Sequence, residues 1–365
     1  MQDNRRKIRV LVVDDSALMR KLISKLLERD EEIEVIATAI DGYFALSKVA
    51  QLKPDVVTLD VDMPRMDGIT ALNEMVSKHQ IPVIMLSSLT TRGAALTMQA
   101  LEKGAVDFIC KPKSAAQVGE MADELLSKVK GAVHSNVLAL NAQSADGKTP
   151  TRKKVTSPPP RRAEYKIVAV GASSGGPHAL RYLLPRLPAD LDAGIVIVQH
   201  MPESFTSMMA RWLDDICDLE VREARDGDLA IPGRALIAPG NRHMKVKRTA
   251  AGCEVRLDDG PLVNGHRPSV DVLFRSVAEQ FGSSATGLIM TGMGSDGAQG
   301  LGDMKKAGGL TIAQDKESCS VYGMPRAAQD RGAVVKVLAL TEMPTYVIGT
   351  VGRMVDLEES YAGTR

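Results

Sequence analysis

The sequence predicts an α/β fold with two doubly wound, mainly parallel-sheet domains joined by a flexible linker. Its 365 residues exceed the usual size of a single hydrophobic core. Two long segments alternate short apolar runs with stretches of helical periodicity, which is the pattern of a parallel sheet covered by helices. The stretch between them, which includes NAQSADGKTPTRKKVTSPPPRR, is polar, proline-rich and locally basic, as an extended connector would be. We therefore place the first domain at 7–130, the linker at 131–163, the second domain at 164–352 and a tail at 353–365.

The first domain contains five strand–helix units, which predict an open parallel sheet with helices on both faces. The predicted strands are KIRVLVVDD, EVIATAI, DVVTLD, PVIMLSS and AVDFICKP. The predicted helices are 16–30, 44–52, 70–79, 95–104 and 115–130. Ser16 precedes the first helix and is a suitable N-cap, because its hydroxyl can accept a hydrogen bond from the first turn.

The second domain shows the same alternation of apolar runs and helical stretches. Its predicted strands lie in YKIVAVGASSGG, AGIVIVQH, RALIAPG, ATGLIMTGMG and GLTIAQD. Its predicted helices are 178–187, 204–216, 269–281 and 298–307. A second mainly parallel α/β domain is therefore expected.

Charge and composition argue against several classes of function. Lysine and arginine number 46 against 45 acidic residues, and aromatic residues make up 3% of the chain, so we expect no binding to nucleic acid. No segment approaches the roughly 18 apolar residues that span a bilayer, so we expect no membrane insertion. The four cysteines lie far apart without a CxxC pair, which favours a reducing compartment. We therefore expect a cytoplasmic protein.

Charged residues follow three strands of the first predicted sheet. Asp14 and Asp15 end the first strand, Asp60 ends the third, and Lys111 ends the fifth. The carboxyl ends of parallel strands share one edge of a sheet, so these groups should meet there. Several carboxylates together favour a cation, and oxygen-only ligands suit Mg²⁺. A carboxylate beside that metal can accept a phosphoryl group, whose oxygens Lys111 and the hydroxyl of Ser87 would contact. Ordinary helix caps and loop acids are the alternative interpretation.

The stretches LVVDDSALMR, DVVTLDVDMPRMDG, PVIMLSS and AVDFICKP resemble the receiver domain of response regulators, over roughly residues 8–128. The resemblance implies that Asp60 is the phosphoacceptor, with Mg²⁺ as the cofactor of phosphorylation and a histidine kinase as the phosphodonor. The metal ligands that it implies are Asp14, Asp15, Asp60 and the backbone carbonyl of Asp62. The switch residues that it implies are Ser87, Phe108 and Lys111.

The stretch VGASSGGP, residues 170–177, has two chemical interpretations. The pattern G-x-S-x-G holds a serine on a sharp strand-to-helix turn, which would expose Ser173 as a nucleophile. Glycines before a helix N-terminus also form phosphate sites. GASSGG lacks the lysine of a P-loop and does not match GxGxxG, which counts against a nucleotide site. The motif alone leaves both interpretations open.

A nucleophilic serine needs a base, and the base needs a group that orients it. Of the six histidines, His200 ends a predicted strand and should share a sheet edge with Ser173. His243 is the weaker candidate or a substrate contact, and His266 lies in a predicted polar loop. Asp296 follows the run ATGLIM at the same edge and is the candidate acid. The glycines of TGMGSDG allow backbone N–H groups to point at a reacting oxygen.

The stretches VGASSGGP, IVIVQHMP, ALIAPGNRHM, NGHRPSVDVLF and MTGMGSDGAQGL resemble the CheB family of chemotaxis protein-glutamate methylesterases, over roughly residues 164–350. The resemblance implies a serine hydrolase that demethylates glutamyl methyl esters of chemotaxis receptors and deamidates glutamines, without a cofactor for hydrolysis. The triad that it implies is Ser173, His200 and Asp296. The oxyanion contacts that it implies are the backbone N–H groups of Met293 and Ser174, where Ser174 replaces the expected threonine.

Two other classes of protein compete with this interpretation. One is a receiver domain fused to a non-catalytic module whose GASSGG loop binds a phosphate or a nucleotide. The other is a receiver-controlled DNA-binding regulator, but no basic recognition helix stands out in 164–365. For the hydrolase, we expect that phosphorylation of Asp60 opens access to Ser173.

Overall fold

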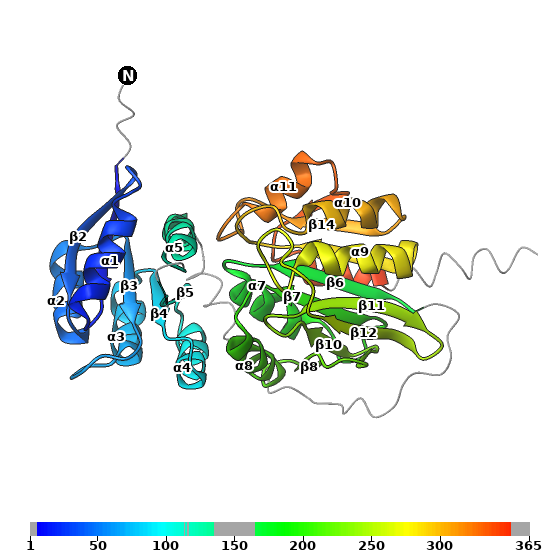
Figure 1. Cartoon of the computed structure of the whole chain (residues 1–365), viewed down its shortest axis with the longest axis horizontal. Coiled ribbons are helices and arrows are strands. Elements are labelled where there is room, and N and C mark those ends of the chain that lie inside the picture. Colours follow the sequence, from blue (N-terminus) through cyan, green and yellow to red (C-terminus); the bar gives the residue numbers. More distant parts are fainter. Residues whose placement is uncertain (1–5, 113, 115–116, 135–164, 352–365) are drawn as a thin grey trace, which may run out of the picture. The chain divides into compact units, whose positions relative to one another are not determined.

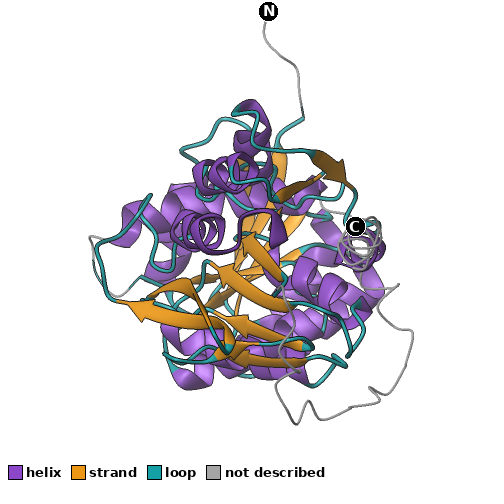
Figure 2. Ribbon diagram, turned by 90° about the vertical axis from the view of Figure 1, so that its right-hand side faces the viewer, coloured by secondary structure: helices purple, strands orange, loops and turns teal. Residues whose placement is uncertain are grey.

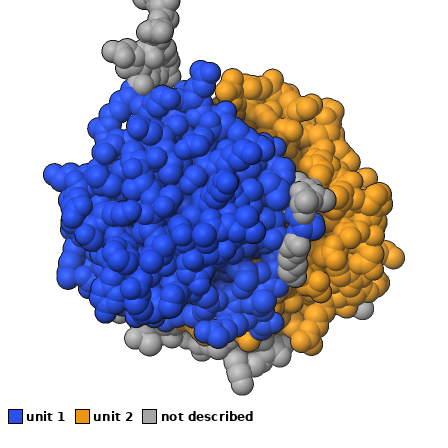
Figure 3. Space-filling view, turned by 60° about the vertical axis from the view of Figure 1, so that its left-hand side comes forward, with its two compact units in different colours: residues 1–145 blue, residues 146–365 orange. Residues whose placement is uncertain are grey.

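The structure, a computed structural model, describes residues 6–112, 114, 117–134 and 165–351. The chain divides into two compact units, residues 1–145 and residues 146–365 (Figure 3). Each unit has its own parallel sheet with flanking helices (Figure 1; Figure 2). The predicted fold class, two mainly parallel α/β domains, is therefore confirmed.

The first unit contains a five-stranded parallel sheet in the order β2-β1-β3-β4-β5. Its strands are β1 (Ile8–Val13), β2 (Ile33–Ala39), β3 (Val56–Asp60), β4 (Val83–Ser87) and β5 (Asp107–Cys110). Each overlaps its predicted run. Strand β1 has a neighbour on each side and helices over both faces, which is why its buried part, Val10–Val13, reads as an unbroken apolar run rather than an alternating one. The winding of the chain reverses between β1 and β3, and ligands of such sheets bind at the reversal.

The first unit has five described helices, of which the first four begin at side-chain caps. They are α1 (Ala17–Leu27), α2 (Gly42–Leu52), α3 (Gly68–Glu74), α4 (Thr91–Glu102) and α5 (Gln117–His134). Ser16 caps α1 as predicted, because its side chain accepts a hydrogen bond from the Met19 N–H. Asp41, Asp67 and Thr90 cap the next three helices in the same way. The predicted helix 70–79 is α3 followed by a π-helical turn, η1 (Met75–His79).

The second unit contains a seven-stranded parallel sheet in the order β15-β14-β13-β6-β7-β10-β8. Its strands are β6 (Ile167–Ala172), β7 (Gly194–Gln199), β8 (Glu220–Glu223), β10 (Arg234–Ile237), β13 (Ala285–Ile289), β14 (Leu310–Gln314) and β15 (Lys336–Leu338). The winding reverses between β6 and β13, so the ends of these two strands form the edge where a ligand is expected.

Helices cover this second sheet. They are α7 (Gly176–Leu183), α8 (Glu203–Asp214), α9 (Val270–Phe281), α10 (Ala298–Lys306) and α11 (Met324–Asp330), with short 3-10 turns η2 (Leu184–Arg186) and η3 (Gly282–Ser284). Helix α9 lies close against β6, because a Cβ on Gly171 would fall 2.2 Å from Val270 Cγ1. The sequence predicted four of these helices but not α11.

A small antiparallel sheet in the second unit was not predicted. It has the order β11-β12-β9 and consists of β9 (Leu229–Ala230), β11 (His243–Thr249) and β12 (Gly252–Asp258). Along β11, Met244 and Val246 are buried whereas Lys245 and Lys247 are exposed. This alternation is the usual signal of a half-buried strand and was available in the sequence.

The predicted linker and tail lie mostly outside the described residues. Helix α5 continues to His134, so the first four residues of the predicted linker, 131–134, are helical. Residues 135–163 and the tail 353–365 are not among the described residues. In the described ranges, no helix is both long and apolar enough to cross a bilayer.

Candidate functional sites

The aspartates that the sequence predicts to cluster in the first unit do lie together, at the ends of β1 and β3. One oxygen from each of Asp14, Asp15 and Asp60 lies within 4.8 Å of the others. Lys111 Nζ bridges the two buried members, at 2.8 Å from Asp14 Oδ2 and 2.7 Å from Asp60 Oδ2. Asp15 is exposed, so solvent reaches the cluster. The side chain of Asp62, a predicted ligand through its carbonyl, is also exposed. An open cluster of oxygen ligands fits a hard cation such as Mg²⁺.

The surroundings of Asp60 oppose its negative charge. Burial raises the pKa of Asp60 to about 6, although its hydrogen bond to Lys111 acts in the opposite direction. Burial lowers the pKa of Lys111, but its hydrogen bonds to Asp14 and Asp60 outweigh burial, and the pKa is raised. A divalent cation in the cluster would favour the ionised form of Asp60, which is the nucleophilic form.

The two predicted switch side chains next to this cluster are buried. Ser87 ends β4, and its hydroxyl accepts a hydrogen bond from Thr97 Oγ1 at 2.8 Å. Phe108 lies in β5, where Lys128 Nζ is 5.0 Å from the centroid of its ring. Both side chains therefore point into the unit.

Ser173 lies on a sharp turn between β6 and α7. Its N–H donates to Thr291 O at 3.0 Å, and the Gly176 N–H donates to its carbonyl at 2.8 Å. Gly175 has a φ of +75°, and a Cβ there would fall 2.5 Å from Ser320 Oγ. Backbone conformation and close packing thus both require glycine, as the G-x-S-x-G pattern predicts.

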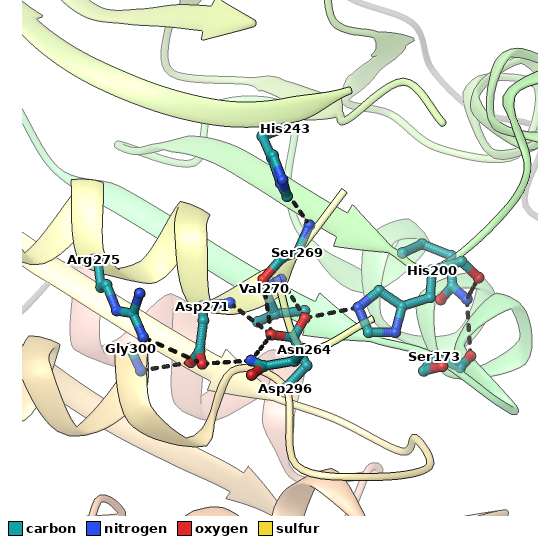
Figure 4. A network of polar contacts seen from close by, with 11 residues as sticks. Ser173, His200, His243, Asn264, Ser269, Val270, Asp271, Arg275, Asp296 and Gly300 are labelled. Atoms are coloured by element: carbon teal, nitrogen blue, oxygen red, sulfur yellow. Dashed lines mark hydrogen bonds and ion pairs between the residues drawn. The ribbon is translucent and has the colours of Figure 1, made fainter. Parts of the chain in front are cut away.

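His200 follows β7 and lies beside the serine turn. Its N–H donates to Ala172 O at 3.1 Å, and Gln199 Nε2 donates to Ser173 O at 2.8 Å. His200 Nε2 lies 2.9 Å from Asp296 Oδ2, whereas His200 Nδ1 is buried without a hydrogen-bond partner among the described residues. Figure 4 shows this second ring nitrogen on the side that faces Ser173. The structure therefore brings the three predicted residues to one sheet edge.

Asp296 follows β13 and is 1% exposed. Five donors surround its carboxylate (Figure 4). They are His200 Nε2 at 2.9 Å and Val270 N at 2.7 Å on Oδ2, and Asn264 Nδ2 at 2.7 Å, Ser269 Oγ at 2.8 Å and Asp271 N at 3.3 Å on Oδ1. Burial raises the pKa of Asp296, but the hydrogen bond and charge of His200 and the other donors outweigh burial and hold this pKa far below its usual range. Asp296 therefore stays ionised and can stabilise an imidazolium.

His243, the weaker candidate base, does not have a free ring nitrogen. It is buried at the start of β11, where Nδ1 accepts from Ser269 N–H at 3.2 Å and Nε2 lies 2.9 Å from Pro261 O. Both nitrogens thus contact the backbone, and Figure 4 shows the contact with Ser269. His243 supports the segment that carries Ser269 and, through it, Asp296.

Asn264 was not identified from the sequence as a residue of this site, and His266 was placed in a polar loop without a role. They lie in a four-residue turn whose ends exchange backbone hydrogen bonds, Val263 N–H to His266 O at 3.1 Å and His266 N–H to Val263 O at 2.9 Å. Asn264 and Gly265 have φ values of +52° and +78°, as in a type I′ turn. The Asn-Gly pair was the available signal, and the predicted polar loop is this turn.

The ring of His266 stacks on that of His200. Their centroids are 3.8 Å apart, and their planes are inclined by 14°. Burial lowers the pKa of His266 to about 4, and the charge of His200 acts in the same direction. His266 is therefore neutral near pH 7.

The backbone N–H groups of Ser174 and Met293, near Ser173, can donate to an acceptor from outside the chain. Gly292 N–H donates to Val321 O at 3.0 Å, but across the described ranges the N–H groups of Ser174 and Met293 donate to no backbone carbonyl. A Cβ on Gly292 would fall 2.8 Å from Ser173 Cβ, so this segment runs close to the serine. These are the N–H groups that the sequence resemblance assigns to an oxyanion.

The fold and the two clusters define a response regulator in which a receiver domain accompanies an α/β enzyme domain. Two family models match the chain: "Response regulator receiver domain" over residues 10–123 and "CheB methylesterase" over residues 168–347. The chain belongs to the CheB family of protein-glutamate methylesterases/protein-glutamine glutaminases.

Curated relatives and a solved structure support this assignment. The protein-glutamate methylesterase/protein-glutamine glutaminase 2 of Koribacter versatilis is 50% identical over 349 residues, which are 93% of this chain and 95% of the relative. The corresponding enzyme of Sulfurimonas denitrificans is 49% identical over 331 residues, 90% of this chain and 94% of the relative. The crystal structure of the Thermotoga maritima CheB methylesterase catalytic domain matches with a TM-score of 0.50 and 40% identity, covering 51% of this chain and 99% of that domain. These matches do not favour a phosphate-binding module.

Proposed function

We propose that this chain hydrolyses glutamyl methyl esters of chemotaxis receptors and deamidates receptor glutamines, with Ser173 as nucleophile, His200 as base and Asp296 as the orienting acid. The observation that carries this proposal is the geometry of His200. Its Nε2 is held by Asp296 at 2.9 Å, and its Nδ1 lacks a partner and faces Ser173 (Figure 4). The contact with an ionised carboxylate keeps the proton on Nε2, so Nδ1 offers its lone pair.

The proposed reaction is acyl transfer in two steps. Ser173 Oγ attacks the ester carbonyl while its proton passes to His200 Nδ1, and Asp296 stabilises the imidazolium. The proton then passes to the leaving oxygen, and methanol departs from the acyl-serine. Water attacks this ester with His200 again as base, which releases a glutamate and restores the serine. With a glutamine substrate, ammonia leaves in place of methanol.

The backbone supplies the charge stabilisation in this proposal. The N–H groups of Ser174 and Met293, which donate to no backbone carbonyl in the described part of the chain, would receive the developing oxyanion. One such donor is worth on the order of 3 kcal/mol of barrier in acyl transfer.

We also propose that Asp60 accepts a phosphoryl group from a histidine kinase. The residues proposed to hold Mg²⁺ are Asp14, Asp15, Asp60 and, through its backbone carbonyl, Asp62. The cation would neutralise charge on the phosphoryl group during its transfer. Lys111, which already bridges two carboxylates, would contact a phosphoryl oxygen, with Ser87 and Phe108 as the switch residues. The clustered oxygens support this assignment.

The receiver domain at 7–130 is proposed to control the enzyme domain at 164–352 across the linker at 131–163. Unphosphorylated receiver would limit access to Ser173, and phosphorylation of Asp60 would shift the population towards open forms. Dependence on a histidine kinase would place the protein in the cytoplasm. Equal hydrolysis rates with and without a small-molecule phosphodonor and Mg²⁺ would reject this control.

The serine mechanism is tested by methanol release from membranes that carry receptor with labelled methyl esters. Ser173→Ala in the full chain should lower release by at least about 10³-fold, because the nucleophile is lost. The exposed serine next to the acid gives a matched control, and Ser295→Ala should keep the wild-type rate. Persistent release by Ser173→Ala would reject the mechanism.

A further inference from the structure

The type I′ turn of residues 263–266, here called the VNGH turn, contacts both the acid and the base of the site. Its Asn264 amide reaches Asp296, and its His266 ring covers His200. Asn264 is itself exposed, so the turn approaches the buried carboxylate from the solvent side. The proposed mechanism assigns no role to Asn264.

The Asn264 amide donates to two carboxylates at once. Its Nδ2 lies 2.7 Å from Asp296 Oδ1 and 2.8 Å from Asp271 Oδ2 (Figure 4). The two N–H bonds therefore have one carboxylate each, and a flipped amide would turn its oxygen towards both negative charges. The contacts thus fix the orientation of the amide without ambiguity.

Asp271 is an anchor for this amide. It is buried at the start of α9, where Oδ1 accepts from Gly300 N–H at 2.7 Å and Oδ2 lies 3.6 Å from the Arg275 guanidinium. Because both oxygens of Asp271 have partners, its carboxylate is held in place and can fix the Asn264 amide, from which it accepts a hydrogen bond. The amide hydrogens also lie between the charges of Asp271 and Asp296, which reduces their mutual repulsion.

We propose that Asn264 is a positioning residue for ester hydrolysis, whose amide holds the Asp296 carboxylate in the orientation in which Oδ2 meets His200 Nε2. The proposal rests on the proposed function of Ser173, His200 and Asp296. Without the amide, Oδ2 keeps its contacts with Val270 N–H and His200, but Oδ1 keeps only the Ser269 hydroxyl and a long contact with Asp271 N at 3.3 Å. The orientation of the carboxylate is then held less tightly on the Oδ1 side.

The turn itself allows a clean test. Asn264 has a φ of +52°, a conformation that glycine adopts without steric cost, so Asn264→Gly removes the amide and keeps the turn. Gly265 has a φ of +78° with no atom within 4 Å of a built Cβ, and asparagine tolerates this conformation. Gly265→Asn is therefore the matched control.

The first measurement is steady-state methanol release by the full chain. Asn264→Gly should lower kcat about 10-fold and leave KM within about 2-fold of the wild type. This decrease in kcat is at the lower end for the loss of a hydrogen bond to a charged group, because water can enter the vacated, exposed position. Gly265→Asn should keep both parameters within about 2-fold, because it leaves every contact of the amide in place. A change in KM alone would indicate a role in substrate binding and would overturn the proposal.

The second measurement is the pH profile of Asn264→Asp. The new carboxyl would face the charges of Asp271 and Asp296, with Arg275, His200 and His266 as the other titratable or charged groups around it. While protonated it can still donate to Asp296, and once ionised it repels Asp296. Activity of Asn264→Asp should therefore fall as pH rises, giving a descending limb that the wild type and Asn264→Gly lack.

The outcomes separate this proposal from the proposed function. An inactive wild-type chain on methylated receptor rejects the function itself. An active wild type with an equally active Asn264→Gly, or identical pH profiles for the glycine and aspartate variants, rejects the positioning role. If Asn264→Gly fails to fold, the descending limb of Asn264→Asp decides alone, because a merely structural role would not produce it.

Discussion

Replacement of Asp296 with asparagine tests the central geometry, because it keeps the shape of the side chain and changes one oxygen into a donor. All five neighbours of the carboxylate are donors, so the new NH₂ group faces a donor in either orientation. At the Oδ2 position it faces His200, which must then accept at Nε2 and carry its proton on Nδ1. That tautomer cannot take the proton of Ser173.

The expected magnitude follows from the tautomer. A wrong tautomer in a triad lowers kcat about 10⁴-fold, which is about 5 kcal/mol of barrier at about 1.4 kcal/mol for each factor of ten. At least one donor, the Val270 N–H on Oδ2 or those on Oδ1, also loses its acceptor, at about 1–3 kcal/mol of stability. The pKa of Asp296 lies far below its usual range, so its stabilising charge is complete above about pH 4 and is lost only as pH falls through the depressed pKa. The loss of stability in Asp296→Asn should therefore be equal at pH 5 and pH 7.

The assay is single-turnover and steady-state methanol release from methylated receptor membranes, with urea unfolding at both pH values. Asp303→Asn on α10 is the matched control, because this aspartate is partly exposed and its contacts are long: ion pairs with Arg275 and Lys306 at 3.7 Å each and a hydrogen bond from Gln299 Nε2 at 3.3 Å. A rate for Asp296→Asn within 10-fold of the wild type would refute the assigned tautomer and with it the role of Asp296.

Three further predictions concern charge and space. Asp60→Asn should stabilise the first unit more at pH 8 than at pH 5 in urea unfolding without Mg²⁺. Burial raises the pKa of Asp60 to about 6, so the ionised form costs stability above that pH, and protonation removes this cost progressively as pH falls from about 6 towards about 4. A larger effect at pH 5 would contradict this sign. Lys128→Met should destabilise the first unit by about 3–5 kcal/mol, because it leaves the buried Asp107 without its ammonium partner at 3.1 Å. The pKa of Lys128 is raised because its ion pairs outweigh burial, so the loss of stability in Lys128→Met should be constant from about pH 6 to 9. A loss of stability that shrinks over this range would argue against the ion pair as its cause. Gly292→Ala should lower methanol release at least about 10-fold, because its Cβ would fall 2.8 Å from Ser173 Cβ and 2.2 Å from Met324 Sδ. An unchanged rate would show that the segment moves without disturbing the site.

The convergence of both sites could be predicted from the sequence because a simple rule governs it. Parallel strands end at a common edge, so polar residues just after buried strands meet in space. This reasoning placed Asp14, Asp60 and Lys111 together, and it placed Ser173 and His200 on one edge. The same rule favoured His200 over His243, which begins an antiparallel strand and has both ring nitrogens bound to the backbone.

The support of Asp296 could not be predicted in the same way. Its donors Asn264, Ser269 and Val270 come from a turn and a helix start whose approach to β13 depends on tertiary packing. No periodicity in the sequence encodes that approach. The Asn-Gly pair predicts a turn. It does not predict that the asparagine of this turn contacts a carboxylate 32 residues further along the chain.

Each unit has a buried aspartate after a strand of its parallel sheet, Asp60 in the first unit and Asp296 in the second. The pKa values of these two aspartates are shifted in opposite directions. Asp60 is 4% exposed and shares the Lys111 ammonium with Asp14, so burial prevails and raises its pKa to about 6. Asp296 is 1% exposed and accepts from five donors, so its pKa falls. Under the proposed function Asp296 stabilises an imidazolium, which needs a permanent negative charge, and the fixed donors keep that charge in place. Under the proposed function Asp60 should react only when a cation and a phosphodonor are present. An acid with few hydrogen-bond partners suits that role, because its nucleophilic form then depends on the cation. Burial alone therefore does not set the behaviour of a strand-end aspartate; the number of donors that the surrounding loops deliver does.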